Sequence, residues 1–280
     1  MDAQTLSFLL LCSAALLFVL AMLGLPWWVA RQRARVRQQA FPAQWRKILQ
    51  RRVPLVRRLP ADLQLQLKKH IQVFIAEKAF IGCAGLRITD EMRVVIAAQA
   101  CLLLLNRPTD FYPGLRQILV YPAAFVVDRT HTDGAGVLQE QRQALAGESW
   151  SQGQVILSWQ DSLEGAAVAD DGRNVVIHEF AHQLDQENGP ANGAPPPAPG
   201  VPDHNPQRWS QVFHAAFAQL QRQARTGHAG LLDPYGAQDP AEFFAVASEV
   251  FFEQPEALRL EHPDLYRELA GFYRVDPASW

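Results

Sequence analysis

Two histidines and a glutamate stand at positions that suit metal chemistry. His178, Glu179 and His182 lie in the apolar run V-V-I-H-E-F-A-H-Q-L-D, in the order H-E-x-x-H. In an α-helix, residues four apart lie on one face, so both imidazoles can point at one ion while the glutamate lies beside them. Catalytic zinc keeps three protein ligands and an open position for a water that a nearby carboxylate deprotonates. The pattern predicts a zinc-binding helix, and the expected chemistry is peptide hydrolysis.

The motif supplies only two ligands, so a third must come from elsewhere in the chain. A metzincin would continue with Gly at 185 and His at 188, but the sequence has Asp185 and Asn188. Downstream, Glu242 follows two helix start signals, Asp239 as N-cap and Pro240 at the first helical position. The spacing alone leaves two interpretations open: Glu242 is the third ligand, or it is a solvent-facing acid favoured by the helix dipole.

Three segments together resemble the Mlc titration factor A family of zinc-dependent peptidases. They are V-V-I-H-E-F-A-H-Q-L-D, D-P-A-E-F-F-A-V-A-S-E-V-F-F and I-T-D-E-M-R-V-V-I-A-A-Q-A-C-L-L-L-L, and the resemblance covers most of residues 61–280. The family's active site is similar to that of the anthrax lethal factor catalytic domain, which has a Tyr seven residues before the ligand Glu. The resemblance implies one Zn²⁺ per chain, held by His178, His182 and Glu242, with Glu179 as general base on a zinc-bound water and Tyr235 as donor to the developing oxyanion.

Two further carboxylates are candidates for hydrogen bonds to the ligating imidazoles. Asp185 shares the helix face of both histidines, and Glu249 shares the face of Glu242. Histidines that bind a metal usually donate their other ring N–H to such a group. Each carboxylate has an alternative interpretation as a solvated surface charge, and the sequence does not decide between the two.

The resemblance also sets the expected function and its rival. The first interpretation is a metallopeptidase that acts on a peptide or protein substrate, as an aminopeptidase or a short-peptide peptidase. The rival is a membrane-tethered binding protein that sequesters a transcriptional repressor or another soluble partner, because the family is known for capturing such a repressor. The two activities are compatible with each other. Direct binding of nucleic acid is not expected.

Periodicity predicts an α+β, predominantly helical chain with a small sheet. The resemblance implies that the chain contains a zincin-like metallopeptidase domain. Short strands are expected at residues 119–121, 125–127 and 155–159. The last of these is either the strand at the edge of the active-site cleft, which would pair with an extended peptide, or an ordinary internal strand. Helices are expected at residues 63–80, 92–105, 174–186, 208–225 and 258–273.

The N-terminus carries an apolar run from Leu6 to Leu25, long enough to span a bilayer as a helix. No basic residue precedes it, which argues against a secretory signal peptide. Four arginines follow it at positions 31, 33, 35 and 37. The positive-inside rule then predicts a single-pass inner-membrane protein, anchored through this helix, with its catalytic domain in the cytoplasm.

Charge divides the chain unevenly. Residues 31–60 hold ten Lys or Arg and no acid, which leaves 16 bases against 27 acids in residues 61–280. A basic segment next to an anchor suits anionic lipid headgroups better than nucleic acid. The expected organisation is an anchor at 1–30, a basic juxtamembrane segment at 31–60 and a peptidase domain at 61–280. The three cysteines, an odd number without C-x-x-C spacing, exclude a disulfide framework.

A proline-rich segment follows the expected zinc helix. Residues 189–206 include the run G-A-P-P-P-A-P-G, which cannot form a helix or a central strand. The segment is therefore expected to be a surface loop. Two interpretations remain open: a lid that borders the cleft, or an insertion with no part in the chemistry.

Overall fold

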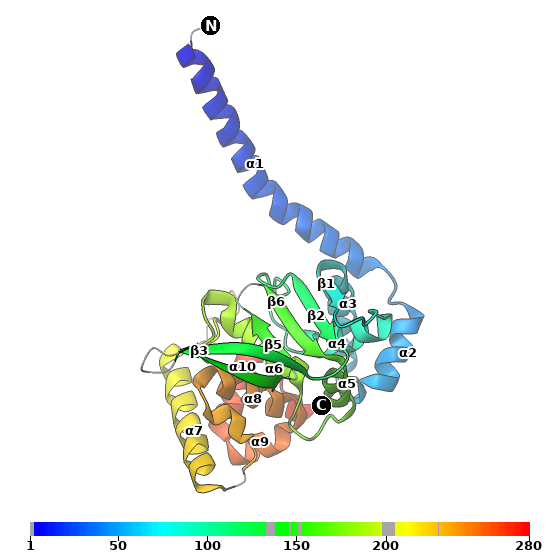
Figure 1. The fold of residues 1–280 in the computed structure, drawn as a ribbon. Helices are drawn as coiled ribbons and strands as arrows, with labels where there is room; N and C mark the ends of the chain where they lie inside the picture. Colours follow the sequence, from blue (N-terminus) through cyan, green and yellow to red (C-terminus); the bar gives the residue numbers. More distant parts are fainter. Residues whose placement is uncertain (1–2, 133–137, 146, 151–152, 198–204, 229) are drawn as a thin grey trace. The chain divides into compact units, whose positions relative to one another are not determined.

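The computed structural model describes the chain except for residues 1–2, 133–137, 146, 151–152, 198–204 and 229 (Figure 1). The chain divides into two units, Met1–Ala40 and Phe41–Trp280. The described residues are predominantly helical, as the sequence predicts, and include a small four-stranded sheet and a separate two-stranded sheet.

The first unit consists of one long helix, α1 (Ala3–Gln38), drawn in blue in Figure 1. It continues past Pro26 and includes Arg35 and Arg37 in its last turn. Among the residues that the structure describes, no helix has both the length and the apolar character needed to cross a bilayer. The predicted single-pass membrane localisation, with Leu6 to Leu25 as anchor, is therefore wrong. That prediction used the apolar composition of residues 6–25 and the arginines that follow them, and the structure joins both in one helix.

The second unit contains the remaining elements. Its helices and 3-10 turns are α2 (Ala43–Arg52), η1 (Pro54–Arg57), α3 (Ala61–Glu77), α4 (Asp90–Leu102), α5 (Trp159–Ala167), α6 (Val175–Asp185), η2 (Gln186–Asn188), α7 (Pro206–Thr226), η3 (Pro234–Ala237), α8 (Pro240–Glu253), α9 (Pro255–Glu261), α10 (Pro263–Tyr273) and η4 (Pro277–Ser279). Its strands are β1 (Ala79–Gly82), β2 (Gln117–Tyr121), β3 (Phe125–Thr132), β4 (Leu138–Leu145), β5 (Gly147–Trp150) and β6 (Gln154–Ser158).

The main sheet has the strand order β1-β2-β6-β5. Strands β1, β2 and β6 are parallel, and β5 pairs antiparallel with β6. Strand β6 therefore lies inside the sheet, and the edge position considered for residues 155–159 belongs to β5. The expected strand also ends one residue early, because Ser158 accepts a hydrogen bond from the Asp161 backbone N–H and caps α5. Strands β3 and β4 form a separate antiparallel pair.

Buried helices fill the core of the second unit. In α4, Thr89 caps the helix by accepting from the Met92 N–H, and residues 94–102 are all buried. In α8, every residue from Phe243 to Glu253 is buried, and this helix packs against α6. The expected helix over residues 258–273 is instead two helices, since Pro263 has no N–H to continue the first one. The core thus holds α6 and α8, the two helices that carry the expected ligands, in fixed contact.

Candidate metal centre

Helix α6 brings the two histidines of the H-E-x-x-H motif together. Its N-cap is Asn174, whose side-chain oxygen accepts a hydrogen bond from the Ile177 N–H at 3.0 Å. One helical turn separates His178 from His182, and their ring centroids lie 4.9 Å apart at an interplanar angle of 80°. Their Nε2 atoms lie 3.2 Å from each other. The predicted convergence of the imidazoles is therefore present.

Helix α8 supplies the carboxylate. Asp239 caps this helix as the sequence predicts, because its Oδ1 accepts from the N–H groups of Ala241 and Glu242 at 2.9 and 3.0 Å. The Glu242 side chain then reaches α6, where its Oε2 lies 2.9 Å from Nε2 of His178 and 3.5 Å from Nε2 of His182. The interpretation of Glu242 as a solvent-facing acid does not describe this geometry.

The donor set fits a metal ion. His178, His182 and Glu242 each offer a ligand atom, and these three atoms all lie within 4.8 Å of one another. Two imidazole nitrogens and one carboxylate oxygen suit zinc better than magnesium or calcium, which prefer oxygen ligands. Hydrogen bonding with the two imidazoles holds the pKa of Glu242 well below its usual range, against the opposing effect of burial. An ionised carboxylate is the form that ligates a metal.

Glu179 lies beside these three residues in a buried position. It is 5% exposed, and its Oε2 has no hydrogen-bond partner among the described residues. Burial raises the pKa of Glu179 to about 7, although the neighbouring histidines act in the opposite direction. A carboxyl group with a pKa near neutrality is suited to accept a proton and give it back.

Glu249 and Asp185 have different partners, although the sequence places both beside the histidines. Oε1 of Glu249 lies 2.8 Å from Nδ1 of His178, the expected position for a carboxylate that orients a ligand. Asp185 instead accepts hydrogen bonds from the N–H groups of Asn192 and Gly193, both at 2.7 Å. Asp185 therefore fixes the start of the proline-rich segment.

Tyr235 lies close to the imidazole pair, as the seven-residue interval implies. It stands in η3, where Asp233 Oδ1 accepts from its backbone N–H at 2.9 Å. Its ring centroid is 5.9 Å from that of His178, and 38% of the residue is exposed. A partly exposed phenol beside the ligands is accessible to a substrate.

Sequence reasoning missed Glu253, the last residue of α8. Its Oε2 accepts from the backbone N–H groups of Gly172 and Arg173, both at 3.1 Å, and its Oε1 accepts from the Asn174 side chain at 2.9 Å. Burial raises the pKa of Glu253 to about 8. The available signal was the four-residue interval from Glu249, which places both acids on one helix face. Oε2 of Glu249 also accepts from the Asn174 backbone N–H, so Glu249 and Glu253 together hold the N-terminus of α6.

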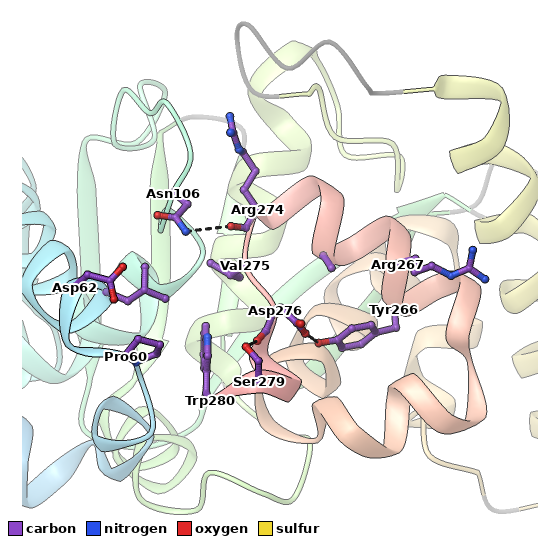
Figure 2. A pocket seen from close by; sticks show the side chains of 12 residues that line it. Pro60, Asp62, Asn106, Tyr266, Arg267, Arg274, Val275, Asp276, Ser279 and Trp280 are labelled. Carbon is purple, nitrogen blue, oxygen red and sulfur yellow. Dashed lines mark hydrogen bonds between the residues drawn. The ribbon is translucent and has the colours of Figure 1, made fainter.

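The second unit also contains a cavity away from these residues. It has a volume of about 540 Å³ and is bordered by the start of α3 and by the residues that follow α10 (Figure 2). Asn106 there donates to the Arg274 carbonyl at 3.2 Å, and the Tyr266 hydroxyl donates to Asp276. None of the residues that form the metal centre lines it. We call this the C-terminal cavity.

Comparison with known proteins shows which proteins the chain is similar to. A family model described as glucose-regulated metallo-peptidase M90 matches residues 27–274. An uncharacterized protein of Synechocystis sp. is 40% identical over 255 residues, which is 91% of this chain and 92% of that protein. Mlc titration factor A of Salmonella arizonae is 35% identical over 233 residues, or 81% of this chain and 89% of that protein.

A further relative confirms the resemblance found in the sequence. Mlc titration factor A of Klebsiella pneumoniae is 35% identical over 233 residues, covering 81% of this chain and 84% of that protein. The family model and these relatives each extend over most of the chain. A metallopeptidase family implies a metal ion and a peptide or protein substrate, and the grouped ligand atoms of α6 and α8 agree with the first of these. The chain belongs to the family of glucose-regulated metallopeptidases M90.

Proposed function

We propose that the chain is a zinc-dependent peptidase whose metal ligands are His178, His182 and Glu242. One observation carries this proposal: three ligand atoms of suitable type converge within 4.8 Å, beside the buried carboxylate of Glu179. When bound, zinc would supply a Lewis acid that polarises the scissile carbonyl and lowers the pKa of a water. The protein side chains supply the remaining steps.

Glu179 acts as the general base and then as the acid. Its buried Oε2 has no competing partner among the described side chains, so it is available to accept the proton of the attacking water. The same carboxyl group then gives this proton to the leaving amine. A pKa near 7 allows both transfers close to neutral pH.

Tyr235 and Glu249 support this chemistry from two sides. The Tyr235 hydroxyl is proposed to donate a hydrogen bond to the developing oxyanion, because the ring lies next to His178 and is accessible. Glu249 accepts from Nδ1 of His178 and so presents Nε2 as the ligand atom. Asp185 instead holds the loop that follows α6.

The substrate is proposed to bind as an extended strand. Strand β5 is the last strand in the sheet order, pairs on one side with β6, and lies against α6. An extended peptide gains backbone hydrogen bonds when it adds to such an edge. This position would present a backbone carbonyl near the metal-binding helix.

The test is a metal and activity measurement on the full chain. We expect about one zinc per chain, hydrolysis of short peptides, loss of hydrolysis with a chelator and its return when zinc is added. Comparing free and N-acetylated forms of one peptide tests the aminopeptidase specificity, since only an aminopeptidase requires the free amine. Hydrolysis that persists without metal would refute the proposal.

A second candidate function is binding of a transcriptional repressor. The names of the Salmonella and Klebsiella relatives, Mlc titration factor A, favour it. Capture and hydrolysis are separable, because a Glu179→Gln variant should retain the fold and any binding surface. Repressor capture that survives this substitution would show a binding function independent of chemistry.

A further inference from the structure

A second cavity lies next to the proposed metal centre. Its volume is about 190 Å³, several times the roughly 30 Å³ that one water occupies in the liquid. It is bordered by the loop after α6, by α7 and by the start of α8. We call it the α7 pocket.

Chain neighbours of the proposed ligands line the α7 pocket, although none of the proposed ligands lines it. Pro240 and Phe243 line it, and these two residues flank Glu242 on α8. Asn192 and Gly193 also line it, and both are held by Asp185, which lies one turn after His182. Helix α8 and the loop after α6 therefore adjoin both the pocket and the proposed centre.

The pocket is built rather than left by loose packing. Gly193 has a φ of +76°, and a Cβ at this position would lie 2.3 Å from the Pro240 carbonyl oxygen, so only glycine fits. The Trp209 indole N–H donates to the Gly193 carbonyl at 3.2 Å. The loop is thus fixed against α7 and α8 before any ligand arrives, which reduces the entropic cost of binding.

The lining defines the chemistry of the occupant. Aromatic rings and prolines form much of the wall, with Trp209 and Phe213 stacked at 3.9 Å and Phe213 edge-to-face with Phe243 at 5.8 Å. Among the described lining residues none is an Asp, Glu, Lys or Arg. Ser210 and His214 lie at the exposed side and hydrogen-bond with each other at 3.2 Å. Such a wall suits an apolar group and offers no counter-charge to an ion.

We infer that the α7 pocket binds an aromatic or large aliphatic side chain of the peptide substrate, at a residue next to the scissile bond. This inference depends on the proposed peptidase function. A peptide held at the metal centre has side chains near the adjoining residues. A small side chain would leave the pocket partly unfilled and would therefore gain less from burial than a large one. Ser210, Phe217 and Phe243 then determine specificity.

The experiment uses the full zinc-loaded chain and two pairs of fluorogenic peptides. The peptides of the first pair have either Ala or Phe directly before the scissile bond, and those of the second pair have either Ala or Phe directly after it. At one of the two positions, Phe should raise kcat/KM about tenfold or more over Ala, the typical discrimination of an apolar pocket. The variant Ser210→Phe places a ring at the pocket from an exposed helix position. It should abolish this preference by lowering kcat/KM for the Phe peptide to about the value for the Ala peptide.

The matched control is Gln211→Phe, which adds the same ring at a neighbouring exposed position on α7 that does not line the pocket. This variant should keep the preference. Equal cleavage of the Phe and Ala peptides, or a preference that survives Ser210→Phe, would overturn the inference while leaving the peptidase function intact. If no peptide is cleaved in a chelator-sensitive way, both the proposed function and the inference fail.

Discussion

The metal centre and the C-terminal cavity differ in what their polar groups do. In the C-terminal cavity, Asn106, Tyr266 and Ser279 each donate to an oxygen of a neighbouring residue (Figure 2). At the metal centre, Nε2 of both histidines and Oε2 of Glu242 converge on the same small space. Separate donor–acceptor pairs stabilise the fold. Three ligand atoms that converge can hold a metal ion, although these three also hydrogen-bond with one another. The volume of the C-terminal cavity alone is therefore a weaker indication of chemistry than the converging ligand atoms are.

The sharpest test of this contrast is to remove one ligand atom. His178→Ala or Glu242→Ala should lower zinc affinity by more than about 100-fold. Even the loss of a residue that only hydrogen-bonds to a metal ligand typically lowers the affinity by about 10–100-fold. Peptide hydrolysis should fall with the metal. Zinc content by elemental analysis and titration with a fluorescent chelator would measure the loss.

The control for this test lies in the C-terminal cavity. Ser279→Ala removes the hydroxyl that donates to the Asp276 carbonyl at 2.6 Å. It should leave zinc content and turnover unchanged. If both ligand variants kept full zinc, the assignment of the metal centre would be wrong, and if Ser279→Ala lost zinc, the contrast between the two regions would break.

The next largest effect separates metal binding from chemistry at the same centre. Glu179→Gln should retain zinc and the fold but reduce kcat by about 100-fold or more, roughly the contribution of a general base. The amide has nearly the shape of the carboxyl group and cannot accept the proton. Steady-state kinetics on the zinc-loaded variant measure the loss, and turnover equal to that of the wild type would exclude Glu179 as the base.

A smaller loss is expected for Tyr235→Phe. Because the hydroxyl is proposed to act on the transition state, kcat should fall by about tenfold to a thousandfold while KM changes little. The ring itself stays beside His178, so zinc content should not change. A change confined to KM would instead place Tyr235 in substrate binding.

Glu253 provides the test with the smallest effect on activity. Its folded-state pKa of about 8 lies above the ordinary value of 4.5. The folded state therefore holds this proton more tightly than the unfolded state. The resulting stability is fully present below pH 4.5 and is lost as the pH rises through 8. In Glu253→Gln, the decrease in Tm between pH 5 and pH 9 should become shallower.

This pH effect on the free energy of unfolding should be at most about a few kcal/mol, the order of magnitude for a carboxyl group with a strongly shifted pKa. Glu256→Gln is the matched control, since this acid is exposed and pairs with Arg259 on α9. Thermal unfolding of the three proteins across the pH range gives the comparison. Parallel curves for wild type and Glu253→Gln would show that Glu253 is ionised in the folded state.

Local spacing accounts for the part of the centre that the sequence predicts. His178 and His182 converge because residues four apart share a helix face, whatever surrounds the helix. Asp239 and Pro240 start α8 for equally local reasons, namely a side-chain acceptor followed by a residue without an N–H. The resemblance then added Glu242 and Tyr235, and the structure places both beside the histidines.

Tertiary packing decided what local spacing left open. Asp185 and Glu249 were both candidates in the sequence, yet only Glu249 contacts His178, because α8 packs against α6 there while Asp185 meets the following loop. The position of β5 at the sheet edge and the role of Glu253 also depend on segments distant in the chain. Helical periodicity fixes which side chains share a face, but the partner of that face depends on how the helices pack.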